Sequence, residues 1–299
     1  MNFKKVISIS RPRFWLYEFG TYMIGILTWL YIINQWPWSL VDSAPNWLLY
    51  IWHHRQIISL RWLYFLIPAN IYIYGINDIY DYETDKNNPK KQWYEDLVTP
   101  AEQKSLRKWI LISNLPFLLL MTQLNIYTNI VFLLFLFFAW QYSAYPIRAK
   151  IRPIVDCLFS AGHYVTTAVF AFVMLVWVED LNRIYIWAGV LWCMAMHIYS
   201  AIPDIKADSE AGMYTTAMLF GARGSIFLVG GLYILAGVMS YSWLWVVSPI
   251  ISLIYIYMMM RSYIHIEDNT KLLDIYKYFP WINAIVGMII FWSVLLKVI

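Results

Sequence analysis

Acidic side chains crowd the segment from residue 77 to residue 85, although the 299-residue chain has only 18 Asp and Glu. Asp78, Asp81 and Asp85 follow Asn77 at helical spacing. On a helix that advances about 100° per residue, these three carboxylates and the amide share one face. Like charges at this spacing repel one another. We therefore expect a cation to compensate them.

A second acidic cluster contains Asp204 and Asp208, and it follows a later apolar stretch. The spacing of four residues places both carboxylates on one helical face. Pro203 predicts a kink or a helix restart just before them. Mg²⁺ prefers oxygen ligands and is usually held by one or two carboxylates together with substrate phosphates. The two clusters together predict a magnesium site that binds a diphosphate.

Basic residues stand near both clusters and could contact the remaining phosphate oxygens. Lys91 follows the first cluster, Lys206 lies inside the second, and Arg148 and Lys150 lie between two apolar stretches. Arginine offers two parallel hydrogen bonds to phosphate, whereas lysine acts as a point charge.

Other interpretations of the acidic clusters fit less well. A solvated loop explains one cluster but not two in register. An EF-hand is excluded because its invariant glycine and terminal glutamate are missing. A cation transporter would place its acids near the membrane midplane, where Glu18 and Asp156 are the candidates.

The composition indicates that a membrane positions these residues. Hydrophobic residues make up 61% of the chain and charged residues 13%, whereas soluble domains carry about 25% charged residues. A membrane span needs about 20 mostly apolar residues. We predict an all-α polytopic membrane protein with a single domain over residues 1–299. Its nine spans are centred near Ile24, Tyr72, Phe117, Phe135, Ala168, Gly189, Val229, Leu253 and Ile289.

The distribution of basic residues predicts the orientation of these spans. With the N-terminus in the cytoplasm, all but four of the 22 Lys and Arg fall on the cytoplasmic side, as the positive-inside rule requires. Both acidic clusters then lie on that side. We expect an integral protein of a bacterial or archaeal cytoplasmic membrane, embedded in the lipid bilayer. The net charge of +4 is modest, and we expect no nucleic-acid partner.

The two clusters resemble the motifs of a known family. The segment 77–85 matches the NDxxDxxxD motif of the UbiA superfamily of intramembrane prenyltransferases, and the segment 204–208 matches its second motif, DxxxD. The resemblance covers nearly the whole chain and implies a bundle of two four-helix modules plus a ninth helix. The segments 10–15, 88–90 and 201–216 are similar to those of the carotenoid branch, the lycopene elongases.

This resemblance implies a donor, an acceptor and a set of site residues. The donor is an allylic prenyl diphosphate and the acceptor a hydrophobic isoprenoid such as lycopene. Mg²⁺ is the implied cofactor, with Asn77 as a diphosphate or metal contact. The implied Mg²⁺ ligands are Asp78, Asp81, Asp85, Asp204 and Asp208, and the expected substrate-binding residues are Arg13, Lys91, Tyr142, Arg148, Lys150 and Lys206.

Aromatic residues make up 19% of the chain and suit the chemistry of a carbocation, which aromatic faces stabilise. Most of them are expected at membrane interfaces or in the core. Tyr142 and Tyr145 stand out because they precede the basic pair, and Tyr145 is a candidate catalytic residue. His197 lies on the helical face of the second cluster and either receives a proton or makes an interhelical hydrogen bond. The same alternatives hold for Glu18.

Three other functions remain open at this point. Prenylation of an aromatic quinone precursor would need basic residues deep among the spans, and the spans lack internal Lys or Arg. A terpene cyclase would use the same metal site without any acceptor. A carrier or channel would release no diphosphate.

Overall fold

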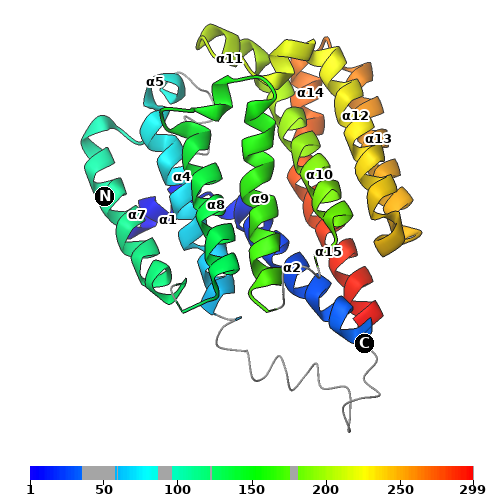
Figure 1. Cartoon of the computed structure of the whole chain (residues 1–299). Coiled ribbons are helices and arrows are strands. Elements are labelled where there is room, and N and C mark those ends of the chain that lie inside the picture. Colours follow the sequence, from blue (N-terminus) through cyan, green and yellow to red (C-terminus); the bar gives the residue numbers. More distant parts are fainter. Residues whose placement is uncertain (36–57, 59, 87–95, 122, 176–180, 299) are drawn as a thin grey trace.

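The computed structural model describes residues 1–35, 58, 60–86, 96–121, 123–175 and 181–298. The described residues form helices and turns and contain no strand (Figure 1). The prediction of an all-α protein is therefore confirmed.

Each of the nine predicted span centres falls inside a helix. These helices are α2 (Trp15–Gln35), α4 (Pro68–Tyr80), α7 (Pro100–Met121), α8 (Ile126–Ser143), α9 (Val155–Val173), α10 (Arg183–Ala201), α12 (Thr216–Leu244), α13 (Val247–Ile264) and α15 (Phe279–Val298). The shorter helices are α1 (Phe3–Ile9), α5 (Tyr82–Asp85), α11 (Ile205–Glu210) and α14 (Asn269–Tyr276).

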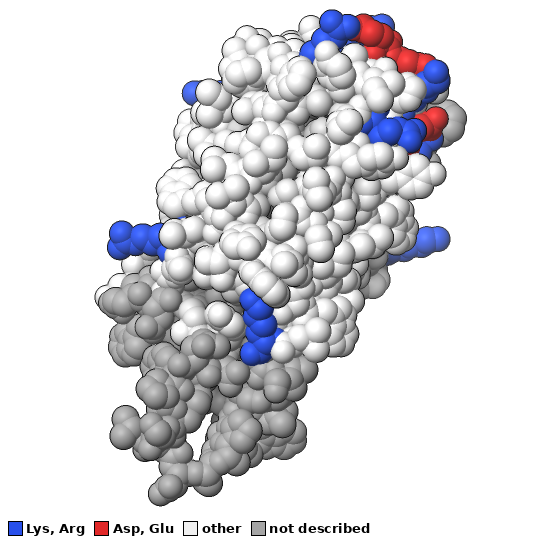
Figure 2. Space-filling model, turned by 90° about the vertical axis from the view of Figure 1, so that its right-hand side faces the viewer, with Lys and Arg blue, Asp and Glu red and all other residues white. Residues whose placement is uncertain are grey.

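Six helical segments among the described residues are long and apolar enough to cross a membrane. They correspond to α8, α9, α10 with α11, α12, α13, and α14 with α15. Helices α2, α4 and α7 are not among them, so the number of nine crossings stays a prediction. Figure 2 shows one face of the molecule, where the visible acidic atoms gather at the upper end and uncharged atoms cover most of the surface.

Helix α9 lies at the centre of the bundle. It packs against α2, α8 and α10, while α12 packs against α10 and α13, and α15 packs against α2. Gly25 of α2 faces Ala168 of α9 so closely that a Cβ atom on Gly25 would lie 2.1 Å from the Ala168 carbonyl oxygen. Small residues permit such close approach of membrane helices.

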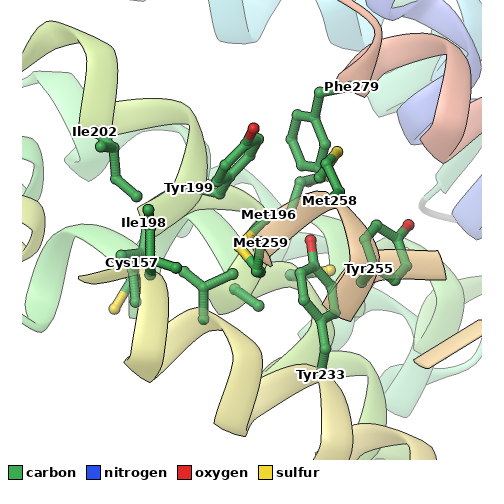
Figure 3. Packing of buried hydrophobic residues seen from close by; sticks show 14 of the residues in the cluster. Cys157, Met196, Ile198, Tyr199, Ile202, Tyr233, Tyr255, Met258, Met259 and Phe279 are labelled. Atoms are coloured by element: carbon green, nitrogen blue, oxygen red, sulfur yellow. The ribbon is translucent and has the colours of Figure 1, made fainter. Parts of the chain in front are cut away.

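Two apolar clusters fill the interior. The first contains Trp29, Phe65 and Phe135 from the N-terminal part of the chain, together with residues of α9. The second combines α9, α10, α12, α13 and α15, and Figure 3 shows Tyr199, Tyr233 and Tyr255 within it. Helix α9 contributes to both clusters, so it connects the two halves of the bundle.

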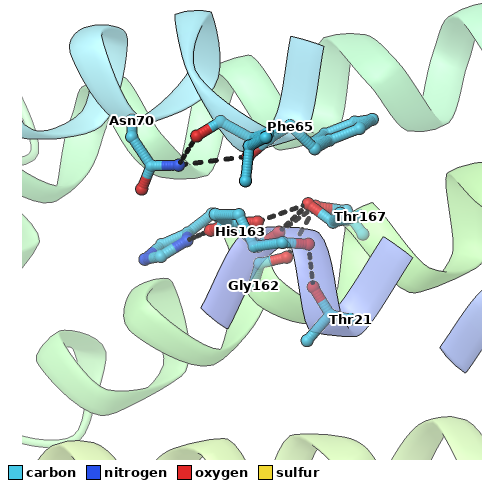
Figure 4. A network of polar contacts seen from close by, with 9 residues as sticks. Thr21, Phe65, Asn70, Gly162, His163 and Thr167 are labelled. Atoms are coloured by element: carbon cyan, nitrogen blue, oxygen red, sulfur yellow. Dashed lines mark hydrogen bonds and ion pairs between the residues drawn. The ribbon is translucent and has the colours of Figure 1, made fainter. Parts of the chain in front are cut away.

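A buried polar network joins α2 to α9 (Figure 4). Glu18 is 1% exposed, and its Oε1 lies 2.5 Å from Nδ1 of His163. The hydroxyl of Thr167 donates to Glu18 Oε2 at 2.7 Å. Both carboxylate oxygens therefore have partners, and the expected pairing of Glu18 with a neighbouring helix is confirmed.

This pairing predicts a large effect of Glu18 on stability. Glu18→Ala removes the acceptor of two buried groups, and each buried donor left unsatisfied costs about 1–3 kcal/mol. We expect a marked fall in Tm for the purified protein in detergent. Glu18→Gln keeps an oxygen acceptor, so its Tm should fall much less. A Glu18→Ala variant with the wild-type Tm would contradict the structural role.

Candidate active site

The first acidic motif lies at the end of α4, where the helix is interrupted. Helix α4 ends at Tyr80, Asp81 has non-helical backbone angles (φ −106°, ψ 7°), and α5 begins at Tyr82. The expectation of one continuous helical face from Asp78 to Asp85 is therefore wrong. Asp78 and Asp81 are buried, whereas Asp85 is half-buried.

Asp78 is held by a basic residue from the N-terminal segment. Its carboxylate is 2% exposed, and Nη2 of Arg11 lies 3.0 Å from Oδ1. The same nitrogen donates to Oδ1 of Asn77 at 3.3 Å. The amide of Asn77 in turn donates to Asp81 Oδ2 at 2.6 Å and to the Ser143 hydroxyl at 3.0 Å. Asn77 thus connects both carboxylates to the end of α8.

Asp81 forms an ion pair with Lys150, which the sequence placed among the phosphate-binding residues. Both side chains are almost fully buried. Burial raises the pKa of the Asp81 carboxyl, and the positive charges of Lys150 and Arg148 oppose that rise. A buried carboxylate with a cationic partner keeps its negative charge more readily.

The other predicted binding residues are more exposed. Tyr145 is 61% exposed, and its hydroxyl accepts a 2.7 Å hydrogen bond from Nη1 of Arg148. Arg13 is exposed, with its guanidinium carbon 4.6 Å from the centre of the Phe14 ring. Lys206 is exposed on α11. Lys91 lies outside the described residues.

The second motif follows a helix break, as Pro203 predicted. Helix α10 ends at Ala201, a short 3-10 turn spans Ile202–Asp204, and α11 then begins. Asp204 and Asp208 are half-buried. Helices α5 and α11 lie at the same end of the bundle (Figure 1).

Tyr142 connects the two motifs electrostatically. Its phenol interacts with the charges of Asp81 and Asp208, one from each motif, and with that of Asp156. Both acidic clusters therefore lie within electrostatic range of the end of α8, at the same end of the bundle (Figure 1).

The ligand atoms that this site offers suit a hard cation. Within the described residues, no group of three or more His, Cys, Asp or Glu side chains lies close enough to hold a metal ion. The buried donors of the first motif are carboxylate oxygens beside Arg11 and Lys150. Mg²⁺ is commonly bound by one or two carboxylates, with waters and phosphate oxygens as its other ligands. The residues present fit that arrangement.

A small cavity lies beside α4 at Tyr74, four residues before Asp78. It has a volume of about 120 Å³ and is lined by residues of the 3-10 turn Pro12–Phe14 and of α2, α4, α9, α10, α14 and α15, including Tyr74, Tyr164 and His197. The guanidinium of Arg11 lies 4.7 Å from the centre of the Tyr74 ring. The ring of Tyr142 lies 5.8 Å from that of His197. The cavity is thus next to Arg11, which contacts the first motif, and its lining residue His197 lies beside Tyr142.

A much larger apolar cavity of about 520 Å³ extends between α2, α9, α10, α12 and α15. Of the described residues, those that line it include no charged side chain. Tyr17, Tyr164 and Met196 line both cavities. These three residues therefore lie at the junction between the small cavity and the large one.

Two residues of this region were not predicted as site residues. Arg11 contacts Asp78, although only its neighbour Arg13 was predicted to bind substrate. The available signal was its place in the Arg-Pro-Arg segment at residues 11–13, where Arg11 has left-handed backbone angles (φ 52°) before the 3-10 turn Pro12–Phe14. Asp156 is fully buried and accepts hydrogen bonds from the backbone and hydroxyl of Thr216. Its isolation in an apolar stretch marked it only as a candidate transporter acid.

Comparison with known proteins assigns the family. The sequence profile of the UbiA prenyltransferase family matches residues 56–283. A lycopene elongase/hydratase from Corynebacterium glutamicum is 33% identical over 273 residues, which cover 87% of this chain and 94% of that protein. A lycopene elongase/hydratase from Halobacterium salinarum is 34% identical over 236 residues, which cover 78% of each chain.

The fold has counterparts among solved structures. A UbiA homologue from Archaeoglobus fulgidus bound to GPP and Mg²⁺ superposes with a TM-score of 0.62. The match covers 97% of this chain and 99% of that one, at 18% identity. Profile, relatives and fold agree, and we conclude that this chain belongs to the UbiA prenyltransferase family.

Proposed function

We propose that this protein transfers an isoprenyl group from an allylic prenyl diphosphate to an apolar isoprenoid acceptor such as lycopene, with Mg²⁺ as cofactor. The observation that carries the proposal is the uncharged 520 Å³ cavity that adjoins the small cavity lined by Tyr74 and His197. Ligand cavities usually measure roughly 300–1,000 Å³. The relatives named lycopene elongase/hydratase support the same acceptor class.

In this proposal the diphosphate lies between the two motifs. The Mg²⁺ ligands are Asp78, Asp81, Asp85, Asp204 and Asp208, and bound Mg²⁺ would supply Lewis-acid stabilisation of the leaving oxygens. Arg11 and Lys150, which contact the first motif, provide positive charge for the phosphate oxygens. The predicted roles of Asn77, Arg13, Lys91, Tyr145, Arg148 and Lys206 are retained as part of the proposal.

The reaction breaks the bond between the allylic carbon and the diphosphate oxygen, and the electron pair leaves with the oxygen. A terminal double bond of the acceptor then attacks the allylic cation, so that a carbon–carbon bond forms and the positive charge moves to the acceptor. Tyr74 and Tyr164 line the small cavity, where their ring faces would stabilise the cation. Loss of a proton or capture of water completes the product.

The larger cavity would hold the acceptor. An aromatic quinone precursor with an acidic group would leave a carboxylate unpaired among apolar residues, which is costly. We further propose that residues 1–299 form one domain with both motifs on the cytoplasmic side.

Purified protein incubated with Mg²⁺, dimethylallyl diphosphate and lycopene tests this function. We expect stoichiometric release of diphosphate and a prenylated carotenoid, both abolished by EDTA and restored by excess Mg²⁺. A cyclic hydrocarbon formed from the diphosphate alone would favour a cyclase. Prenylation of 4-hydroxybenzoate in place of lycopene would favour a quinone pathway, and the absence of diphosphate release would favour a carrier.

A further inference from the structure

We infer that His197, which lies beside the buried Asp156, is the catalytic base that removes the proton from the product cation. The inference rests on the proposed prenyl transfer and adds the residue that completes it. Three features of the structure support it, namely the position of His197 on a cavity wall, its buried carboxylate partner and its place relative to both acidic motifs.

His197 belongs to α10 and lines the small cavity. Its side chain is 15% exposed, so part of the ring remains accessible. Tyr74 of α4 and Tyr164 of α9 line the same cavity. His197 therefore lies where the reacting carbon atoms are expected, and not on the lipid-facing surface.

Asp156 is a rigid partner for the imidazole. Its carboxylate is fully buried, and it accepts hydrogen bonds from the backbone N–H groups of Cys157 and Thr216, both at 2.7 Å, and from the Thr216 hydroxyl. Nε2 of His197 lies 3.9 Å from Oδ2 of Asp156. This separation is too long for a hydrogen bond, but a fixed carboxylate at such a distance stabilises the imidazolium that forms when the ring takes up a proton.

The position of His197 between the motifs and the acceptor cavity suits the last step of the reaction. Its ring lies edge-on to Tyr142, which interacts with the charges of Asp81 and Asp208. On the other side, Tyr164 and Met196 connect the small cavity to the large one. The base thus lies near the cation without competing for the metal ligands.

The buried pair of Glu18 and His163 is less suitable as a catalytic base. Both oxygens of Glu18 accept hydrogen bonds, from His163 and Thr167, and none of these three residues lines either cavity.

In the proposed step, a C–H bond next to the cationic carbon breaks and its electron pair forms the new double bond. The proton passes to the ring nitrogen of His197 that does not face Asp156, and later to water.

His197→Asn tests this role with dimethylallyl diphosphate, lycopene and Mg²⁺. General-base catalysis contributes about 10²–10⁴-fold, so we expect formation of the normal transfer product to fall about 100-fold. Diphosphate release from dimethylallyl diphosphate alone should stay within about two-fold of wild type. With lycopene deuterated beside the reacting double bond, the variant should show a larger isotope effect than wild type, because proton loss becomes slow.

His265→Asn is the matched control, since His265 lies at the end of α13 and lines neither cavity. It should leave all three measurements unchanged. The inference is overturned if His197→Asn keeps the normal product at a wild-type rate, or if diphosphate release and transfer fall equally. His197→Gln is judged by the same criteria where the Asn variant does not fold. Failure of wild-type protein to release diphosphate would instead refute the proposed function.

Discussion

Asp78→Asn should abolish prenyl transfer, with a loss in kcat on the order of 1,000-fold, the upper range for removing one preorganised electrostatic group. Asp78 is 2% exposed and forms an ion pair with Arg11. The substitution keeps the shape of the side chain and removes its charge. The site would then bind a cation and a diphosphate less well; because Arg11 also loses its charged partner, the loss of activity is scored only in a variant that folds. Mg²⁺-dependent diphosphate release and product formation are the measurements.

Glu83→Gln is the control for this experiment. Glu83 lies in the same acidic segment, but its side chain is 76% exposed and pairs with Lys86 on the surface. Exposed ion pairs contribute only about 0–1 kcal/mol, so activity should remain close to wild type. Asp208→Asn should reproduce the Asp78 result from the second motif. If a folded variant of either aspartate retained more than a few per cent of activity, the ligand assignment would be wrong.

Gly287→Leu should weaken binding of the acceptor without changing the reaction of the prenyl diphosphate donor. Gly287 of α15 lines the large cavity, and a Cβ atom added there meets no atom within 4 Å. A larger side chain can therefore begin there without a clash, and from this position it would project into the open space that borders the cavity. Changes of one methylene in an apolar pocket alter discrimination by about 10–200-fold, and we expect kcat/KM for lycopene to fall about 100-fold. Diphosphate release from the donor alone should be unchanged.

Gly231→Leu distinguishes cavity filling from a general effect of replacing glycine. Gly231 lies in the exposed face of α12, has no atom within 4 Å of an added Cβ, and lines neither cavity. Both substitutions improve helix propensity by a similar amount. Equal losses in the two variants, or full activity of Gly287→Leu, would show that the large cavity does not bind the acceptor.

At the first motif the sequence predicted the residue types of the site but not the shape of the backbone. The residues that could bind a metal follow from their types and spacing, and Lys150 was correctly expected near them because it follows an apolar stretch on the same side. The break at Asp81 was not predicted, since no proline or glycine marks it. It coincides with a tertiary contact, the ion pair of Asp81 with Lys150. A local pattern does not contain that contact.

The sequence by itself determined where the helices lie, because runs of apolar residues are stable as helices in a membrane, and it placed carboxylates at the ends of two of them. Only the tertiary structure decided which groups meet. Arg11 contacts Asp78 across 67 residues, and Asp156 contacts Thr216 across 60. The two cavities likewise arise from helices that are distant in sequence. Helix formation depends on near neighbours, whereas these contacts depend on how whole helices pack, which no short segment encodes.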